Sequence, residues 1–374
     1  MSRNRYFLRV RENHNHAPLF DQLAHCSLFQ LREVTEILRF PRRSRETLKI
    51  PRFGPKMSIF FGAELNPNGD LPTSSTQICV LLATYNGAKW LDEQIDSIIA
   101  QHGVRSTIVV SDDASTDGTS ALLQRRNQDL PMTLLPASTG RFGSAHKNFL
   151  RLIREAPVGE AEFVALADQD DIWLPNKLLR AVHCLRTMQV DGYSSDVVAF
   201  WPDGRRRVLR KSDPQCSDDY LFGSPGPGCT FVLPRAIFDI MRTWVTAESS
   251  SMQEIWVHDW LIYAYVRGQG FRWHIDNQPN MLYRQHGGNE IGANRGWHAA
   301  IARLQHVRSG AYRRDILAIA DVVGVRSPTV DAVRRLNMSD RIWLLIHVRH
   351  LRRRLSEALL LAVLIFCMPR GSGP

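Results

Sequence analysis

Short apolar runs that end in polar turns and are followed by helix-forming segments repeat along the chain from Gln77 onward. Runs this short and this apolar are typical of strands buried on both faces of a parallel sheet. The clearest runs are residues 78–84, 107–110 and 163–167. After the first run, Leu91, Ile95 and Ile98 recur at the spacing of one helix face. Alternating strands and helices with short connections predict an α/β fold with a mostly parallel, Rossmann-like sheet flanked by helices.

Further elements follow from the same two patterns: short apolar runs predict strands, and apolar residues at helical spacing predict helices. Helices are expected at residues 115–126, 146–155, 175–188, 235–244 and 258–267. Strands are expected at residues 132–135, 197–201, 229–233 and 271–275. Pro175 suits the first turn of its helix, because the backbone N–H that proline lacks would be unpaired there.

Charge is unevenly distributed along the chain. Of 374 residues, 47 are Lys or Arg and 37 are Asp or Glu, a net charge of +10. Residues 1–56 carry +7 and residues 295–374 carry +9, so the segment between them is acidic, at −6. A nucleic-acid-binding protein gathers basic residues on its folded face, and this division argues against such a partner. We expect a poorly patterned, disordered extension (1–75), an α/β domain (76–294) and a basic helical region (295–374).

The chain shows no feature of secretion or of a membrane span. Its six cysteines are scattered, without a Cys-x-x-Cys pair or zinc-binding spacing, which indicates a reducing compartment. The longest apolar run, residues 358–368, is shorter than the ~18 residues of a spanning helix. Residues 349–354 hold four arginines; beside a short apolar helix they fit docking on an anionic membrane surface, or equally a solvated charge run. We expect a cytoplasmic protein, peripheral contact with the inner membrane face remaining open.

Polar clusters directly follow three of the predicted strands: Thr84-Tyr85-Asn86, Ser111-Asp112-Asp113 and Asp168-Gln169-Asp170-Asp171. Ligands of open α/β sheets bind at the carboxyl ends of the strands, so these clusters should meet in one acidic crevice. Carboxylates alone would repel a nucleotide diphosphate, and a Mg²⁺ or Mn²⁺ ion between them resolves that conflict. An isolated Asp-x-Asp is commonly a solvated turn. Here a companion diaspartate at the preceding strand end favours a metal site.

Several of these segments resemble the signatures of glycosyltransferase family 2, whose members are inverting, nucleotide-sugar-dependent enzymes of the GT-A fold. The resembling segments are residues 83–87, 111–119 and 167–173. The Asp-Gln-Asp-Asp-Ile-Trp form, His258-Asp259-Trp260 and residues 283–289 are similar to rhamnosyltransferase-like bacterial members that build O-antigen and exopolysaccharide. The resemblance runs from about Ile78 to Asn294.

The resemblance implies a nucleotide site and a metal site. The residues concerned are Thr84, Tyr85, Asn86 and Asp112 for the nucleotide, and Asp168 and Asp170, with Asp171 nearby, for the metal and diphosphate. Asp112 would accept a hydrogen bond from the base, and Asp170 would be the more direct metal ligand. The implied donor is dTDP-rhamnose or a UDP-sugar, and the implied acceptor is a hydroxyl of a cell-surface glycan or lipid-linked sugar. Ala114 departs from the family, which often has Gly there, and Leu261 replaces a commonly aromatic residue.

Asp259 is implied to be the catalytic base, although its position equally suits a helix N-terminal charge favoured by the macrodipole. A carboxylate on the face opposite the leaving diphosphate would take the proton of an acceptor hydroxyl as that hydroxyl attacks C1 of the sugar. One such displacement inverts the anomeric configuration. The Gln-x-x-Arg-Trp segment of processive synthases is absent near Gln285, which favours the addition of single sugars.

Some residues near these motifs have two interpretations each. Possible donor or acceptor contacts are Asp171, Trp173, His258, Trp260, Arg284 and His286. The two tryptophans could stack on sugar rings or belong to the core, and Arg284 and His286 could pair phosphate oxygens or serve packing. Arg141 could approach the donor or be solvated surface.

Two other classes of function fit parts of the sequence. A sugar-1-phosphate nucleotidyltransferase has a related α/β fold, but it should carry a basic, Gly-rich loop after the first strand. Residues 84–87 contain no basic residue. A non-enzymatic membrane- or nucleic-acid-binding protein fits the net charge of +10 but not the acidic middle of the chain.

Overall fold

The computed structural model describes residues 75–138, 140–248, 252, 255, 257–286 and 305–369. The extension expected at residues 1–75 therefore lies outside the described residues, apart from its last residue.

A seven-stranded sheet forms the centre of the fold, in the order β10-β6-β9-β4-β1-β2-β3. Its strands are β1 (Thr76–Thr84), β2 (Val104–Asp112), β3 (Met132–Leu134), β4 (Phe163–Ala167), β6 (Gly192–Ser195), β9 (Val232–Pro234) and β10 (Trp273–Asp276). Only β9 runs antiparallel to its neighbours, β4 and β6. The sheet is therefore mostly parallel, which confirms the predicted fold class.

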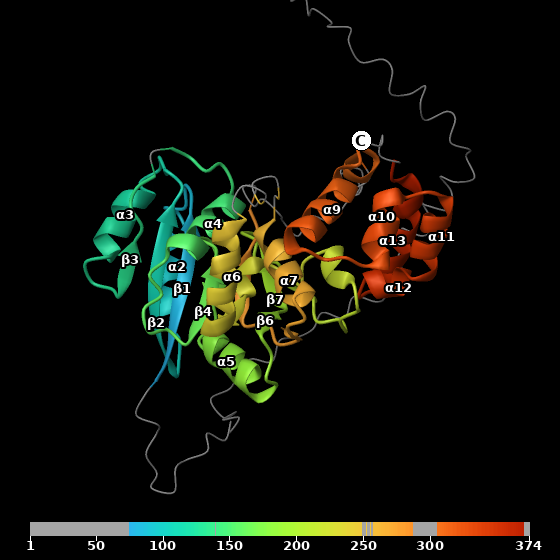
Figure 1. Ribbon diagram of the computed structural model, residues 1–374. Coiled ribbons are helices and arrows are strands. Elements are labelled where there is room, and N and C mark those ends of the chain that lie inside the picture. Colours follow the sequence, from blue (N-terminus) through green and yellow to red (C-terminus); the bar gives the residue numbers. More distant parts are fainter. Residues whose placement is uncertain are drawn as a thin grey trace, which may run out of the picture. The chain divides into compact units, whose positions relative to one another are not determined.

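Helices cover both faces of this sheet because successive side chains of each strand point to opposite sides. The helices are α2 (Leu91–Ile99), α3 (Thr119–Arg126), α4 (Ala145–Glu155), α5 (Lys177–Thr187), α6 (Arg235–Ala247) and α7 (His258–Gly268). Cys79 and Leu81 of β1 belong to a core shared with α4, α6 and α7, whereas Ile78 and Val80 belong to one shared with α2, α3 and α5. Figure 1 shows α4 and α6 side by side over the sheet.

A second, four-stranded sheet was not expected. Its order is β5-β11-β7-β8, with β5 (Ile172–Trp173), β7 (Val197–Phe200), β8 (Arg206–Leu209) and β11 (Met281–Arg284). It brings the segment after Asp171 next to residues 281–284, more than a hundred positions later in the chain.

Several predicted boundaries were wrong by two residues or more, among them the strand expected at 271–275, which begins at Trp273. The strand expected at 229–233 begins only at Val232, because residues 228–230 form a 3₁₀ turn, η2 (Gly228–Thr230). The helix expected to open at Pro175 begins at Lys177, with Asn176 as its N-cap residue.

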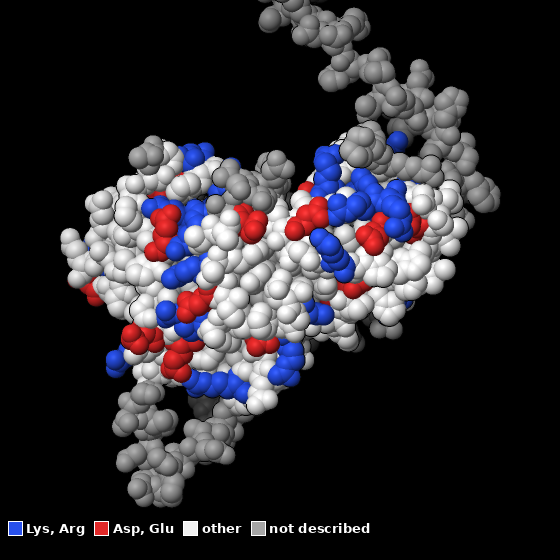
Figure 2. Space-filling view, viewed as in Figure 1, with Lys and Arg blue, Asp and Glu red and all other residues white. Residues whose placement is uncertain are grey.

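The described C-terminal part is helical: after helical residues 305–308 it contains α9 (Ala311–Val323), α10 (Pro328–Arg335), α11 (Met338–Ile346), α12 (Val348–Leu351) and α13 (Leu355–Cys367). Their buried residues, such as Ile316 and Leu361, belong to the same core as Leu261 of α7. Among the described residues, no helix combines the length and the apolar character that crossing a bilayer requires. Figure 2 shows Lys and Arg side chains gathered over α9 and α10, with Asp and Glu between them.

The arginine run at 349–354 is not the free basic stretch that membrane docking would use. The side chains of Arg352, Arg353 and Arg354 are only 28%, 12% and 30% exposed. Each of them bonds inward: Arg352 to the Tyr312 hydroxyl, Arg353 to Asp219 and Arg354 to the Asp213 carboxylate. Three of the four arginines therefore bond to other segments of the protein instead of extending freely into solvent.

Candidate active site

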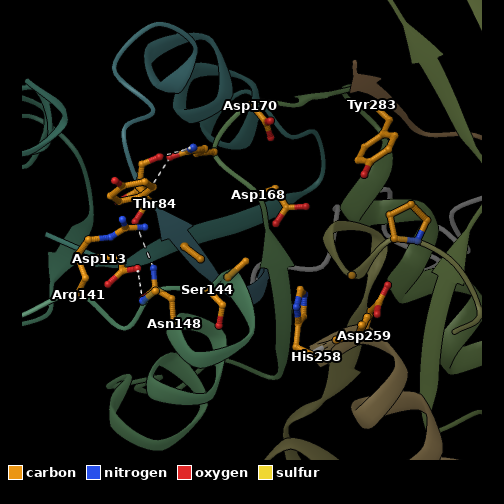
Figure 3. Close-up of a pocket in the computed structure, with 18 residues that line it drawn as sticks. Thr84, Asp113, Arg141, Ser144, Asn148, Asp168, Asp170, His258, Asp259 and Tyr283 are labelled. Carbon is orange, nitrogen blue, oxygen red and sulfur yellow. Dashed lines mark hydrogen bonds between the residues drawn. The ribbon is translucent and has the colours of Figure 1, made fainter. Parts of the chain in front are cut away.

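The three polar clusters meet at one edge of the sheet because β4, β1 and β2 are neighbours in register. Thr84 lies opposite Asp112, and Leu82 lies opposite Ala167, so the strands end at nearly the same level. A pocket opens beyond these ends. Thr84, Tyr85, Asp168 and Asp170 line it together with Asp259 (Figure 3).

Side chains cross-link the loops at one end of the pocket. The Gln169 amide bridges the Tyr85 backbone, with its Oε1 accepting from the Tyr85 N–H and its Nε2 donating to the Tyr85 carbonyl, each at 2.8 Å. Asn86 ties the same loop to the next one, since its Oδ1 accepts from the Thr116 N–H at 2.8 Å. A Cβ at Gly87 would lie 2.1 Å from Gln169 Oε1, so a larger residue there would displace the Gln169 side chain.

Asp112, the residue that the resemblance assigns to the base, is the centre of this cross-link. Its carboxylate accepts from the Thr84 hydroxyl at 2.7 Å and from both the N–H and the hydroxyl of Ser115, at 3.0 and 2.6 Å. Ser120 adds a fourth bond at 3.1 Å. A carboxylate has about four lone-pair sites. Asp112 thus orders the loop, and it does not line the pocket, whereas its neighbour Asp113 does.

No definite role was predicted for three residues that line this end of the pocket: Asp113, Arg141 and Asn148. Asp113 is buried and accepts from the N–H groups of Phe142 and Gly143. It thereby holds the 140–143 loop so that the Arg141 guanidinium stacks 3.7 Å from the Tyr85 ring. Asn148, on α4, donates to the carbonyls of Thr84 and Ser111. Only the fold shows that Asn148 reaches two strand ends.

The aspartates after β4 are held by residues near the end of the domain. His286 Nε2 lies 2.6 Å from Asp170 Oδ2, and the imidazole stacks on Trp90 with ring centroids 4.1 Å apart. The Arg284 backbone N–H donates to Asp171 Oδ1 at 3.1 Å, and its guanidinium donates to the Asp170 carbonyl at 2.7 Å. Arg284 and His286 therefore position the diaspartate.

The residues after β4 fit a divalent cation by their chemistry. Asp168, Asp171 and Cys229 each have a ligand atom within 4.8 Å of the others. Asp171 is fully buried, and among the described residues its Oδ2 has no hydrogen-bond partner. Burial, together with Asp170 and Asp168, raises the pKa of Asp171 well above its usual range. The Asp168 and Asp171 carboxylate oxygens suit Mg²⁺ and Mn²⁺, whereas the Cys229 thiol does not. The buried Lys177 side chain also interacts with Asp171.

Asp259 lies at the other end of the pocket, in the first turn of α7 (Figure 3). Its Oδ1 accepts from the Trp260 N–H at 2.7 Å, and its Oδ2 accepts from the Ser224 hydroxyl at 3.1 Å. Burial raises the pKa of Asp259 to about 6, although Ser224, the Trp260 N–H and Lys211 oppose that rise. A carboxyl group with this pKa is mostly ionised at neutral pH and remains basic enough to accept a proton.

The structure separates the remaining sequence candidates. His258 lines the pocket beside Asp259 and stacks on Phe149 with ring centroids 4.1 Å apart. Burial lowers its pKa to about 3, so the imidazole is neutral. Trp173 and Trp260 are only 3% and 8% exposed, which is the core position that the sequence left open as an alternative to sugar stacking.

The fold and the pocket define a glycosyltransferase, and comparisons with known proteins agree. The model of the family described as "Glycosyl transferase family 2" matches residues 79–242. The chain is 38% identical over 244 residues to "dTDP-rhamnosyl transferase RfbG" of Shigella flexneri, which covers 65% of this chain and 84% of that protein. The chain therefore belongs to glycosyltransferase family 2 and has the GT-A fold.

Solved structures also resemble the fold. One is residues 1–349 of TarS from S. aureus in complex with UDP, which is 14% identical with a TM-score of 0.47 and covers 78% of this chain and 87% of that chain. Another is the mannosyltransferase PcManGT of Pyrobaculum calidifontis in complex with GDP-Man and Mn²⁺, 22% identical with a TM-score of 0.43, covering 79% and 85%. Neither likeness is close enough to assign a role to a residue of this chain.

Proposed function

We propose that this glycosyltransferase moves a single sugar from a nucleotide-diphosphate donor to an acceptor hydroxyl with inversion, using Asp259 as the base. The observation that carries this proposal is the shared pocket: Asp259 lines it together with the strand-end residues Thr84, Tyr85, Asp168 and Asp170. Asp168 and Asp170 lie between the Thr84 end and the Asp259 end (Figure 3). A donor with its nucleotide near Tyr85 and its diphosphate near Asp168 would present C1 toward Asp259.

The reaction then needs one proton transfer and one displacement. Asp259 takes the proton of the acceptor hydroxyl while the hydroxyl oxygen forms a bond to C1. The bond between C1 and the diphosphate oxygen breaks, and the nucleoside diphosphate leaves with that electron pair. A bound Mg²⁺ or Mn²⁺, held by Asp168 and Asp170 with Asp171 beside them, would supply charge neutralisation to the leaving diphosphate. The Tyr85 loop and the stacked Arg141 hold the nucleotide in place.

For the donor we propose dTDP-rhamnose, with a UDP-sugar as the alternative. The support is the 38% identity to a protein described as a dTDP-rhamnosyl transferase. The acceptor that we propose is a hydroxyl of a growing cell-surface glycan, such as O-antigen, or of a lipid-linked sugar, because the rhamnosyltransferase-like members that this chain resembles build such polysaccharides.

A panel of nucleotide-sugars tests this function. Purified protein is incubated with dTDP-rhamnose, UDP-glucose, UDP-GlcNAc and GDP-mannose, each with Mg²⁺, Mn²⁺ or EDTA, and release of the nucleoside diphosphate is measured. We expect hydrolysis of dTDP-rhamnose that EDTA abolishes. Preference for a UDP-sugar would overturn the donor and leave the class unchanged, and full activity in EDTA would overturn the metal.

We also propose a peripheral contact with the membrane, now through apolar side chains instead of the arginine run. The support is a set of exposed apolar residues on α11 and α13: Met338, Ile342, Ile346, Leu355, Leu359 and Phe366. Side chains such as Ile346, 73% exposed, could enter the boundary between headgroups and acyl chains.

Sedimentation with vesicles tests this contact. The unaltered protein should bind vesicles of phosphatidylethanolamine and phosphatidylglycerol, and the double variant Ile346→Asp with Phe366→Asp should bind at least tenfold more weakly. Val208→Asp is the matched control, because Val208 is 54% exposed but lies on β8. Equal binding of all three proteins, or none by the unaltered one, would contradict the proposal.

A further inference from the structure

The catalytic end of the pocket depends on a loop that reaches back from the second sheet. Residues 210–226 connect β8 to η2 and carry Ser224, whose hydroxyl donates to Asp259 Oδ2 at 3.1 Å. The Ser224 Oγ also accepts from the Gly226 N–H at 3.0 Å and contacts the Gly226 carbonyl, which shares the hydroxyl proton with Asp259. Apart from the short turn η1 (Asp219–Leu221), this loop has no regular structure to hold it. The contacts that reach Ser224 itself therefore set its position against the carboxylate.

Residues 350–354, which form the end of α12 and its link to α13, run along this loop and bond to it repeatedly. The Asp218 N–H donates to the His350 carbonyl at 3.0 Å, and the Cys216 thiol donates to the Arg352 carbonyl at 3.6 Å. The Arg354 guanidinium contacts the Asp213 carboxylate and the Arg210 carbonyl. The C-terminal helices thus supply the scaffold that the loop lacks.

Arg353 makes the contact closest to the chemistry. One of its guanidinium nitrogens, Nη2, donates to the Ser224 carbonyl at 2.9 Å, and the other, Nη1, donates to Asp219 Oδ2 at 3.1 Å. Asp219 is itself fixed, because its side chain accepts from the Tyr263 hydroxyl at 2.9 Å and pairs with Arg267 at 3.5 Å. Tyr263 and Arg267 lie on α7, the helix whose first turn contains Asp259. Arg353 therefore anchors the Ser224 backbone to the same helix that carries the base.

We propose that Arg353 is a positioning residue for the catalytic base: it holds Ser224 so that the Ser224 hydroxyl orients the Asp259 carboxylate toward the acceptor. This rests on the proposed function, because it takes Asp259 as the base. Arg353 lies far outside residues 79–242, which match the family model. The planar fork of its guanidinium suits two acceptors at once, whereas a lysine ammonium is a single point charge. The C-terminal helices thereby become part of the catalytic apparatus.

The experiment compares Arg353→Met with Arg354→Met as the matched control. Arg354 belongs to the same run and also bonds inward, but it contacts residues 210 and 213 instead of Ser224. The assay measures nucleoside diphosphate release from the donor that the unaltered enzyme hydrolyses in the panel above, with water as acceptor. We expect Arg353→Met to lower kcat about tenfold with the donor KM within twofold of normal, and Arg354→Met to lower kcat less than threefold.

A double-variant cycle identifies the path of the effect. Ser224→Ala alone should lower kcat by a similar factor, and Arg353→Met in the Ser224→Ala background should add little, because both changes remove one chain of contacts. Multiplying effects would overturn the proposal. So would a normal kcat in Arg353→Met, an equal fall in Arg354→Met, or a donor KM that rises as kcat falls.

Two further variants keep the outcome interpretable. Removing Arg353 leaves the buried Asp219 with one partner fewer, so Arg353→Met could unfold; Arg353→Lys keeps the charge and loses the fork. Arg353→Lys should be folded by thermal unfolding and have a kcat lowered three- to tenfold, and a normal kcat would overturn the proposal. Turnover retained in Asp259→Asn would instead overturn the base assignment, whereas an inactive Asp259→Asn beside a normal Arg353→Met would overturn the Arg353 proposal alone.

Discussion

The two ends of the pocket are built in different ways. At the Thr84 end, the side chains that hold the loops come from residues 84–169, at the ends of adjacent parallel strands. At the other end, Asp259 depends on Ser224 and, through it, on Arg353, which is ninety-four positions later in the chain than the base. Parallel strand ends place their loops together automatically, whereas the base end needs a long loop and a separate set of helices to hold it.

We expect the largest loss of activity when the proposed base, Asp259, is replaced. Asp259→Asn keeps the shape of the side chain but cannot accept the proton, so kcat should fall about 10²- to 10⁴-fold, the usual contribution of a general base. Nucleotide affinity, measured by calorimetry with dTDP or UDP, should stay within twofold of normal. A variant that turns over normally would show that another group takes the proton.

Changes at the Thr84 end should weaken nucleotide binding more than they lower kcat. Gly87→Ala places a Cβ where Gln169 Oε1 lies, so the bridge to the Tyr85 backbone must open. We expect nucleotide affinity to fall about tenfold, which corresponds to about 1.4 kcal/mol, and kcat to change less. Gln169→Ala removes the same bridge. The double variant should therefore be no weaker than either single one, and additive losses would contradict this account.

The pH dependence of kcat tests the Asp259 end of the pocket, although Asp171 beside Asp168 also has a raised pKa. As the proposed base, Asp259 would work only when ionised, and burial raises its pKa to about 6. Since a raised carboxyl pKa keeps the inactive protonated form present to higher pH, kcat should be constant above about pH 7. It should fall tenfold per pH unit below about pH 6. Nucleotide affinity measured over the same range should not follow this curve. A kcat that is flat down to pH 4.5 would remove Asp259 from the reaction.

The smallest effect concerns the departure at Ala114. Its φ is +54°, in the left-handed region that non-glycine residues enter only at a cost. Ala114→Gly should therefore stabilise the protein by about 0.5–1 kcal/mol in urea unfolding. Ala100→Gly is the matched control: its φ is −77°, so glycine there should destabilise the protein. A loss of stability in Ala114→Gly would show that the alanine methyl group packs favourably.

Predictions from the sequence were most accurate for residues whose position depends only on the strand or helix that carries them. Short apolar runs located β1, β2 and β4, and the parallel strand order brought Thr84, Asp112 and Asp168 to one edge of the sheet. The second sheet was not predicted, because its strands, such as β5 with two residues, are too short to show a period. Arg284 and His286 were recognised as motif residues. Their contacts with Asp171 and Asp170 were not predicted, because the second sheet that brings them there was not.

The amino-acid sequence by itself determined the α/β fold, the strand-end clusters and the family, because each depends on residues close together in the chain. It also showed the charge division, but not what the C-terminal arginines do. Only the tertiary structure decided that Arg353 points inward to Ser224 and Asp219, and that Asp112 is surrounded by hydroxyl donors. The physical reason is that a charged side chain is stabilised by whichever partners the fold brings within reach, and those partners have no fixed spacing along the chain.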